Sequence, residues 1–208
     1  MRQLTLGAAV LLLVLAACSD DDYHYPDLVT ELAEIVLDED GLATQLITDA
    51  GNTYNIADYA QYSNVADTTL RCYCRYVDDD GEITLYTLSV SEVFCTQPAL
   101  YEDQPTDILH VTSAWATKRY LNLYIAAATG SEVSHALGFN IDSISQDSAT
   151  LTRTAHHTLL HQASSDADDY TTRHYVSFPL FYYSGLCDTV TLSVYTDEGL
   201  KTYTAPVP

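Results

Sequence analysis

The sequence predicts an all-β protein, a small barrel followed by an immunoglobulin-like β-sandwich, after a signal peptide and a short tether. Short runs rich in β-branched and aromatic residues alternate with turn signals along most of the chain, and helical periodicity is nearly absent. The runs before residue 97 suit a small barrel, and those after it suit a sandwich. The expected segments are 1–17 (signal peptide), 18–28 (lipidated cysteine and acidic tether), 29–97 (barrel) and 98–208 (sandwich).

The N-terminal residues have the pattern of an export signal. Arg2 precedes an uncharged apolar run over residues 6–17, which is shorter than the roughly 20 residues that a helix needs to cross a bilayer. The run ends in Leu15-Ala16-Ala17-Cys18, which resembles a lipobox, the signal for lipidation of the cysteine and cleavage before it. An ordinary signal peptide with a chance cysteine is the alternative. Because two or more acyl chains anchor a protein stably, the lipid on Cys18 is the expected membrane attachment.

An acidic segment directly follows that cysteine. Ser19, Asp20, Asp21 and Asp22 resemble the surface-export signal of lipoproteins in the Bacteroidota. The resemblance implies an outer-membrane lipoprotein that faces the cell exterior. The alternative is a solvated acidic tether that faces the periplasm.

The composition excludes some classes of partner. The formal net charge is −21, so nucleic acid and anionic lipid headgroups are repelled and neither is an expected partner. The same charge could attract cations or basic proteins. The hydrophobic fraction of 47% is normal for a globular protein, so the acidity does not indicate general disorder.

Turn signals separate the runs of the predicted barrel. Asp38-Glu39-Asp40-Gly41 is a hairpin turn, and residues 49–52 form the next turn. The expected strands are 30–37, 42–48 and 53–56, followed by an irregular or weakly helical segment at 57–66.

The clearest hairpin spans residues 68–94, around the turn at 78–82. Pairing Val77 with Ile83 gathers the apolar residues of both strands on one face, as period-2 alternation requires, and a one-residue slip would break that face. The residues expected on it are Leu70, Cys72, Cys74, Tyr76, Tyr86, Leu88 and Val90.

Proline and polar residues around 97–105 precede the predicted sandwich. Trp115, the only tryptophan, lies in its first run. We expect it to be largely buried with its indole N–H bonded to a partner, and the alternative is an exposed tryptophan that stacks on a ligand. The expected strands are 108–116, 120–127, 137–144, 150–163, 170–180, 189–195 and 200–205.

Several strand patterns in this half resemble the NigD-like lipoproteins of the Bacteroidota. The resemblance covers nearly the whole chain after the signal peptide and implies an N-terminal OB-type barrel and a C-terminal β-sandwich, but it supplies no activity and no catalytic residues. The patterns are Ser113-Ala114-Trp115, Tyr120-Leu121-Asn122-Leu123, His135-Ala136-Leu137-Gly138-Phe139, Leu159-Leu160-His161-Gln162-Ala163, Val176-Ser177-Phe178-Pro179-Leu180, and the closing hairpin with Val190–Tyr195, Gly199 and Tyr203.

Four cysteines remain beyond Cys18. Cys72 and Cys74 share one strand face, about 6.6 Å apart, at the edge of the separation that a disulfide can bridge. We favour small buried thiols at these two positions, and a bridge to Cys95 is the next alternative. Cys187 lies in the other domain. A Cys-x-Cys metal site is disfavoured because no second pair accompanies it.

Histidines and acidic turns are weak candidates for metal binding. If the turn between their strands centres near residues 167–168, His161 faces His174 across a hairpin. Two imidazoles can begin a metal site, but no third ligand is evident, so ordinary sheet-edge histidines are the preferred interpretation and no cofactor is expected. The acidic turns at 38–40, 78–80 and 166–169 lack the ligand order of a calcium-binding EF-hand loop and are interpreted as solvated turns.

The 17 tyrosines fit half-buried strands but could also form a binding surface. Tyr182 and Tyr183 are the expected exposed aromatic spot for a ligand. The sequence shows no nucleophile elbow, phosphate-binding loop or His-Glu-x-x-His motif, so we do not expect an enzyme. The leading hypothesis is a non-enzymatic binding or accessory lipoprotein, with bacteriocin-linked self-protection as one role. The alternative is a glycan- or protein-binding scaffold beside outer-membrane import machinery.

Overall fold

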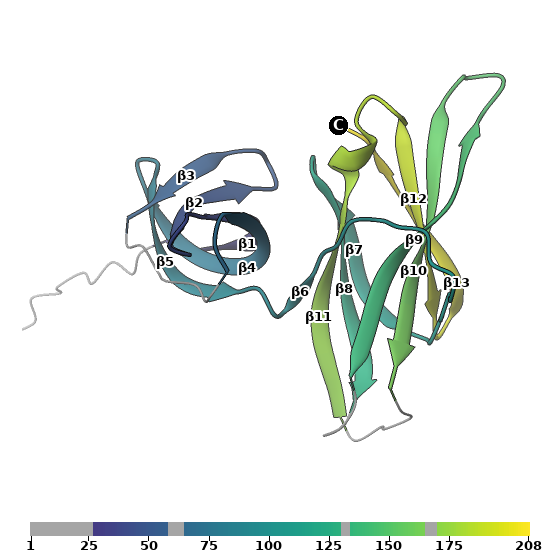
Figure 1. Cartoon of the computed structure of the whole chain (residues 1–208), viewed down its shortest axis with the longest axis horizontal. Helices are drawn as coiled ribbons and strands as arrows, with labels where there is room; N and C mark the ends of the chain where they lie inside the picture. The colour runs from purple at the N-terminus through teal and green to yellow at the C-terminus, as the bar shows by residue number, and fades with distance from the viewer. Residues whose placement is uncertain (1–26, 58–64, 130–133, 165–169) are drawn as a thin grey trace, which may run out of the picture.

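The computed structural model describes residues 27–57, 65–129, 134–164 and 170–208, which form a barrel and a sandwich that lie side by side (Figure 1). Its one described helical element is the 3₁₀ turn η1 (Leu180–Tyr183). Among the described residues, no helix has the length and apolarity that a membrane span requires. The predicted signal peptide, Cys18 and the acidic export segment lie outside the described residues, as does most of segment 57–66.

The first five strands close into a barrel in the order β1-β2-β3-β5-β4, which confirms the predicted OB-type architecture. Strand β1 pairs with both β2 and β4, and β3 pairs in parallel with β5. Closure leaves no free sheet edge along these strands. The strands are β1 (Val29–Leu37), β2 (Ala43–Thr48), β3 (Thr53–Ile56), β4 (Thr68–Asp79) and β5 (Glu82–Ser89). The barrel core contains Ala33, Ile35, Leu37, Ala43, Leu46, Ile56, Cys72, Cys74, Tyr76 and Ile83.

The register predicted for the β4–β5 hairpin is wrong. The turn consists of Asp80 and Gly81 alone, with φ of 52° and 94°, so the strands extend to pair Asp79 with Glu82. Positive φ at both central residues is the type I′ geometry that matches strand twist. A bulge opposite Arg75 and Tyr76 then leaves Tyr86 without a ladder partner and reverses the alternation along β5. Tyr86 is consequently 58% exposed rather than on the inner face.

The remaining strands form two four-stranded sheets, in the orders β13-β12-β10-β9 and β6-β11-β8-β7, which confirms the predicted sandwich. The core between them is built around Phe139, Phe178, Leu159 and Leu192. The strands are β6 (Val93–Phe94), β7 (His110–Ala116), β8 (Tyr120–Thr129), β9 (His135–Gln146), β10 (Arg153–Ala163), β11 (Tyr170–Pro179), β12 (Thr189–Thr196) and β13 (Gly199–Pro206).

Strand β6 places the start of the sandwich earlier than residue 98. It pairs in parallel with β11, through Tyr175 opposite Val93 and Val176 opposite Phe94. The chain therefore passes from barrel to sandwich between Ser89 and Val93. The segment that follows then crosses beside β9 and β10, where Ala99 bridges to Asn140 and Thr106 to His161.

Trp115 is not in the core. It lies on the edge strand β7 opposite Asn122, and cross-strand partners share a face of the sheet. That face is turned away from the sandwich core and toward the barrel. Trp115 is 37% exposed and packs edge-on against Tyr175, with ring centroids 6.4 Å apart. The expectation of a largely buried tryptophan is therefore wrong, because an edge strand here presents its large residue outward.

Candidate functional site at the barrel–sandwich junction

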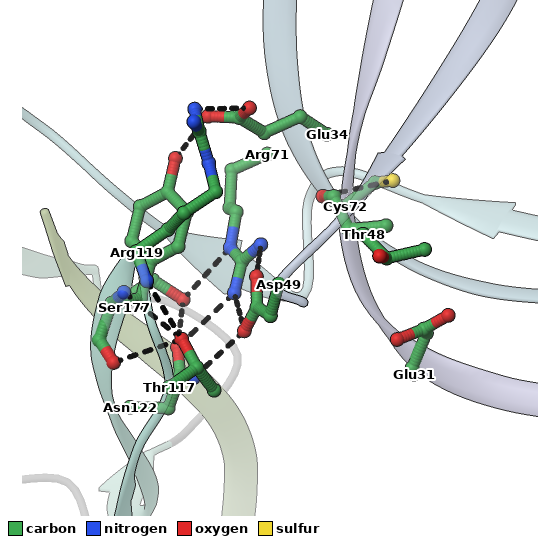
Figure 2. A network of polar contacts seen from close by, with 12 residues as sticks. Glu31, Glu34, Thr48, Asp49, Arg71, Cys72, Thr117, Arg119, Asn122 and Ser177 are labelled. Atoms are coloured by element: carbon green, nitrogen blue, oxygen red, sulfur yellow. Dashed lines mark hydrogen bonds and ion pairs between the residues drawn. The ribbon is translucent and has the colours of Figure 1, made fainter. Parts of the chain in front are cut away.

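The barrel and the sandwich meet across a buried polar network centred on Arg71 (Figure 2). The neighbouring Cys72 and Cys74 face the barrel interior, so alternation turns Arg71 outward, where the sandwich covers it and leaves it 6% exposed. Its Nη2 donates to Oδ2 of Asp49 at 2.9 Å, and its Nη1 donates to Oδ1 of the same carboxylate. Asp49 directly follows β2. This two-point contact is the strongest geometry for an arginine–carboxylate pair.

The sandwich supplies the other half of the network. Nε of Arg71 donates to Oγ of Ser177 at 3.1 Å, and Nη2 also donates to Oδ1 of Asn122 at 3.2 Å. Ser177 donates to the same Asn122 oxygen at 2.7 Å, and Nδ2 of Asn122 donates to Oδ2 of Asp49 at 3.2 Å. A buried ion pair loses its hydration, and such additional hydrogen bonds are what offset that loss. The network therefore links the two domains through Arg71.

A second ion pair lies beside the first. Glu34, on β1, is 6% exposed and accepts a hydrogen bond from Nη2 of Arg119 at 2.7 Å and another from the hydroxyl of Tyr120. Burial and the bond to Glu34 raise the pKa of Tyr120 far above its usual value, so the hydroxyl stays protonated and donates. The guanidinium of Arg71 lies 3.8 Å from the centre of the Tyr120 ring. Tyr120 thus contacts both charged pairs.

A cavity of about 380 Å³ opens between the two domains next to these groups. Glu34 and Arg71 contribute from the barrel, and Tyr120, Phe181 and Tyr182 contribute from the sandwich. Strand β6 adds Val93, the segment after it adds Cys95, Thr96 and Gln97, and the remaining lining residues are Thr69, Leu70, Val90 and Pro179. We call this cavity the junction cavity. Its mixture of apolar rings and a few polar groups is typical of sites that bind a ligand or a partner side chain.

The two tyrosines predicted to form an exposed aromatic spot, Tyr182 and Tyr183, differ in their exposure. Tyr182 is 43% exposed and lines the junction cavity, as an exposed binding residue requires. Tyr183 is only 8% exposed and packs in the sandwich core, with its ring centroid 5.1 Å from that of His157. The expectation that Tyr183 is exposed is therefore wrong, because successive side chains of the 3₁₀ turn η1 point in different directions and that of Tyr183 points into the sandwich core. Ligand binding at Tyr182 stays a prediction.

Cys95 also lines the junction cavity. Burial raises the pKa of its thiol to about 11, so the thiol is neutral near pH 7. Cys72, Cys74, Cys95 and Cys187 are all free thiols. Cys72 and Cys74 are buried in the barrel core, and a hydrogen bond with Cys74 together with burial raises the pKa of Cys72 far above its usual value. The preferred interpretation of buried thiols at these two positions is confirmed.

The predicted pairing of His161 with His174 is wrong. Strands β10 and β11 are consecutive but belong to different sheets, so His161 pairs with Leu137 on β9. Its imidazole neighbour is His135, with His135 Nδ1 2.9 Å from His161 Nε2. Among the described residues, no group of three or more His, Cys, Asp or Glu side chains is arranged to hold a metal ion.

The hydrogen bonds around His161 determine which ring nitrogens carry protons. Nδ1 of His161 lies 3.0 Å from the backbone carbonyl of Asp107, which can only accept, so that Nδ1 is protonated. Nε2 of His161 then accepts from Nδ1–H of His135. Burial, together with the nearby His161 and His174, lowers the pKa of His135. The lowered pKa favours the neutral imidazole of His135, and the bond from His161 to Asp107 anchors the connection that follows β6.

Sequence reasoning missed the residues of the polar network. The available signal was weak: Arg71 is a charged residue between two strand positions that face a core, in a chain with only 8 basic residues. In the sequence, Tyr120, Asn122 and Ser177 stand out only as parts of strand patterns. The structure shows why those patterns carry polar residues, since Asn122 and Ser177 are opposite each other on β8 and β11 and face the barrel.

Comparison with known proteins matches residues 92–206 to the model of the NigD-like C-terminal β-sandwich domain. This match covers more than half of the chain and coincides with the sandwich that begins at β6. No curated protein matches the sequence significantly.

Several solved structures share the fold. A NigD-like immunity protein from Bacteroides caccae is 22% identical with a TM-score of 0.62, over 88% of this chain and 94% of that one. A candidate toxin-related protein from Parabacteroides distasonis is 18% identical with a TM-score of 0.64, over 86% of this chain and 92% of that one. A candidate lipoprotein from Bacteroides fragilis is 11% identical with a TM-score of 0.61, over 88% of this chain and 99% of that one. At these identities the likeness concerns the fold alone.

Proposed function

Because the chain belongs to the NigD-like family, we propose that it is a surface-anchored lipoprotein with a non-enzymatic binding role in bacteriocin-linked self-protection. The observation that carries the binding role is the junction cavity, whose walls come from both domains. The lipid on Cys18 is the proposed membrane attachment, and the acidic segment from Ser19 to Asp22 is the proposed signal for the outer face of the outer membrane.

The polar network supports a binding role because it fixes the shape of the junction cavity. Arg71 and Glu34 line the cavity, and both are held by partners from the sandwich. A cavity whose walls are already in place loses little conformational freedom when a partner binds. Tyr182 lies at its exposed side and offers an aromatic ring with a hydroxyl, a residue type that often dominates the energy of protein interfaces.

The chemistry of the junction cavity favours binding over catalysis. The Cys95 thiol is held neutral, and Glu34 is engaged by Arg119 and Tyr120. A nucleophile or general base needs a reactive protonation state within reach of the reacting group. These groups instead provide fixed hydrogen-bonding and apolar surfaces.

Two similar proteins suggest the biological setting. The Bacteroides caccae protein is described as an immunity protein, and the Parabacteroides distasonis protein as a candidate toxin-related protein. The acidic charge of −21 suits a basic toxin or a basic region of one, because opposite charges speed association. Self-protection through capture of such a protein at the cell surface is the role that we infer.

A gene deletion tests this proposal. Cells that lack the gene are exposed to the culture supernatant of a strain that secretes the bacteriocin, and their sensitivity is compared with that of the parent strain. We expect the deletion to increase sensitivity, and the wild-type gene to restore protection. Tyr182→Ala should restore it poorly, whereas Tyr195→Ala, an equally exposed tyrosine on β12, should restore it fully. Unchanged sensitivity of the deletion strain would show that the chain does not protect the cell. Full protection by Tyr182→Ala would show that the protective binding does not use the junction cavity.

A further inference from the structure

The outer face of the sheet β6-β11-β8-β7 carries large aromatic residues where a solvated face usually carries small polar ones. The ladder places the outward side chains in successive rows across β7, β8 and β11, about 7 Å apart along the strands. The barrel partly covers the first row and contacts the second row through Tyr73, and the later rows extend beyond it. The rows are Trp115, Asn122 and Ser177; then Ser113, Tyr124 and Tyr175; then His110, Ala126 and Arg173; then Ala128 and Thr171.

Trp115, Tyr124 and Tyr175 form an aromatic platform on this face. The rings of Tyr124 and Tyr175 lie 4.8 Å apart, and Trp115 meets Tyr175 nearly at a right angle. Tyr73 of the barrel stacks on Tyr175, with an interplanar angle of 10° and a centroid distance of 5.6 Å. The barrel therefore holds the platform in place from one side, while Trp115 remains 37% exposed on the other.

A hollow of about 440 Å³ adjoins the platform along the strands. Ala126 and Ala128 form its floor, because their small side chains leave room between the neighbouring strands. Arg173 lines it from β11 and is in none of the ion pairs of the described residues. His110 and Asp197 line the far side, with His110 Nδ1 3.0 Å from Asp197 Oδ2.

We propose that the aromatic platform and the alanine-floored hollow together bind a saccharide. A sugar ring has an apolar face of C–H groups, which stacks on an indole or phenol ring, and a rim of hydroxyls, which pair with planar polar side chains. The platform supplies the rings, and Arg173, His110 and Asp197 supply donors and acceptors beside them. Arg173 and Asp197, the two side chains of opposite charge that line the hollow, balance each other, so the hollow suits an uncharged ligand.

The geometry suits a saccharide better than a protein partner. The platform and the hollow together form a strip that follows β8 and β11 over successive rows, with the rings of Tyr124 and Tyr175 in one row and the polar side chains of His110 and Arg173 in the next. A protein interface of standard size buries about 800 Å² on each side and needs a broad apolar centre. The strip is continuous with the barrel contact through Tyr73, so the junction between domains orients one wall of the site.

Affinity electrophoresis tests the proposal with the mature protein in gels that contain soluble xylan, mannan, amylopectin, galactan or dextran. We expect slowed migration in at least one of these gels. Trp115→Ala should weaken that interaction at least about tenfold, as loss of a central aromatic contact does, and Arg173→Ala should weaken it as well. Tyr195→Ala is the matched control, since it is equally exposed but lies on the other sheet.

The single tryptophan gives an independent readout. Oligosaccharides from the polysaccharide that slows the migration of the protein should shift the fluorescence emission of Trp115 and protect it from iodide quenching. Tyr182→Ala should bind these sugars normally, and Trp115→Ala should still restore bacteriocin protection, so the failure of either proposal leaves the other testable. Unslowed migration in all five gels would overturn the saccharide assignment. So would a concentration-dependent dimer in sedimentation that Trp115→Ala abolishes, because the face would then be a contact between two copies.

Discussion

Arg71 and Asp49 form a buried two-point ion pair within the barrel, and the sandwich completes its hydrogen bonds through Asn122 and Ser177. Both charges come from the barrel, but part of their hydrogen bonding comes from the sandwich. The pair therefore depends on both domains. The side chains are 4% and 11% exposed, so neither charge would be well hydrated if its partner were removed.

Removal of one charge should be much more costly than removal of both. We expect Arg71→Met to lower the free energy of unfolding by about 3–5 kcal/mol, because it leaves the Asp49 carboxylate buried and unpaired. The double variant Arg71→Met with Asp49→Leu should recover much of that loss. Urea denaturation followed by circular dichroism measures both. If the double variant is no more stable than the single one, the unpaired charge is not the source of the loss.

Acid should destabilise the protein through one buried and one half-buried histidine. Burial lowers the pKa of His135 and of His157 below the usual 6.5. The unfolded chain therefore binds more protons than the folded one as the pH falls below about 6.5, so the free energy of unfolding should decrease from pH 7 to pH 5. His157→Phe should flatten this dependence. An equal slope in the wild-type protein and the His157→Phe variant would contradict this explanation.

Gly138 is required by the ring of Tyr101. A Cβ at this position would lie 3.0 Å from Cζ of Tyr101, which packs over β9 from the segment that follows β6. We expect Gly138→Ala to cost roughly 1 kcal/mol, the lower end of the range for overpacking, because the half-exposed ring can shift. The cost should disappear in a Tyr101→Ala background. A double-mutant cycle measured by thermal unfolding tests this prediction. If Gly138→Ala is equally destabilising in the Tyr101→Ala background, the strain lies in the backbone and not in the contact with the ring.

The N-terminal signals can be separated by two variants. Cys18→Ala should abolish labelling by radioactive palmitate and release the protein from membranes. Replacement of Asp20, Asp21 and Asp22 by alanine should leave labelling intact but protect the protein from protease added to whole cells. If the triple variant is digested as readily as the parent, the acidic segment is not the surface-export signal.

The sequence was sufficient to predict a strand where one face of that strand is buried. Period-2 alternation located the strands of both domains apart from the two-residue β6, and it identified the buried thiols of Cys72 and Cys74. It failed where a local irregularity changes the alternation, as the bulge at Tyr86 does. It failed also for His161 and His174, because sequence proximity does not reveal that consecutive strands lie in opposite sheets.

The candidate site could not be predicted for a different reason. Its residues come from β1, the end of β2, β4, β8 and β11, and nothing local marks them as neighbours. Alternation says that Arg71 faces outward from the barrel, but only the contact between domains turns that outward position into a buried one. Trp115 is the converse case, since a large aromatic residue in a strand suggested burial and the edge of the sheet leaves it exposed.

Differential scanning calorimetry of the mature wild-type protein tests most directly whether the polar network makes the two domains one unit. We predict a single transition at neutral pH, with equal calorimetric and van't Hoff enthalpies. Asn122→Ala, which removes a partner of both Arg71 and Asp49, should split it into separate barrel and sandwich transitions. Two resolved transitions in the wild-type protein would contradict the account, because the junction cavity would then lie between domains that move independently.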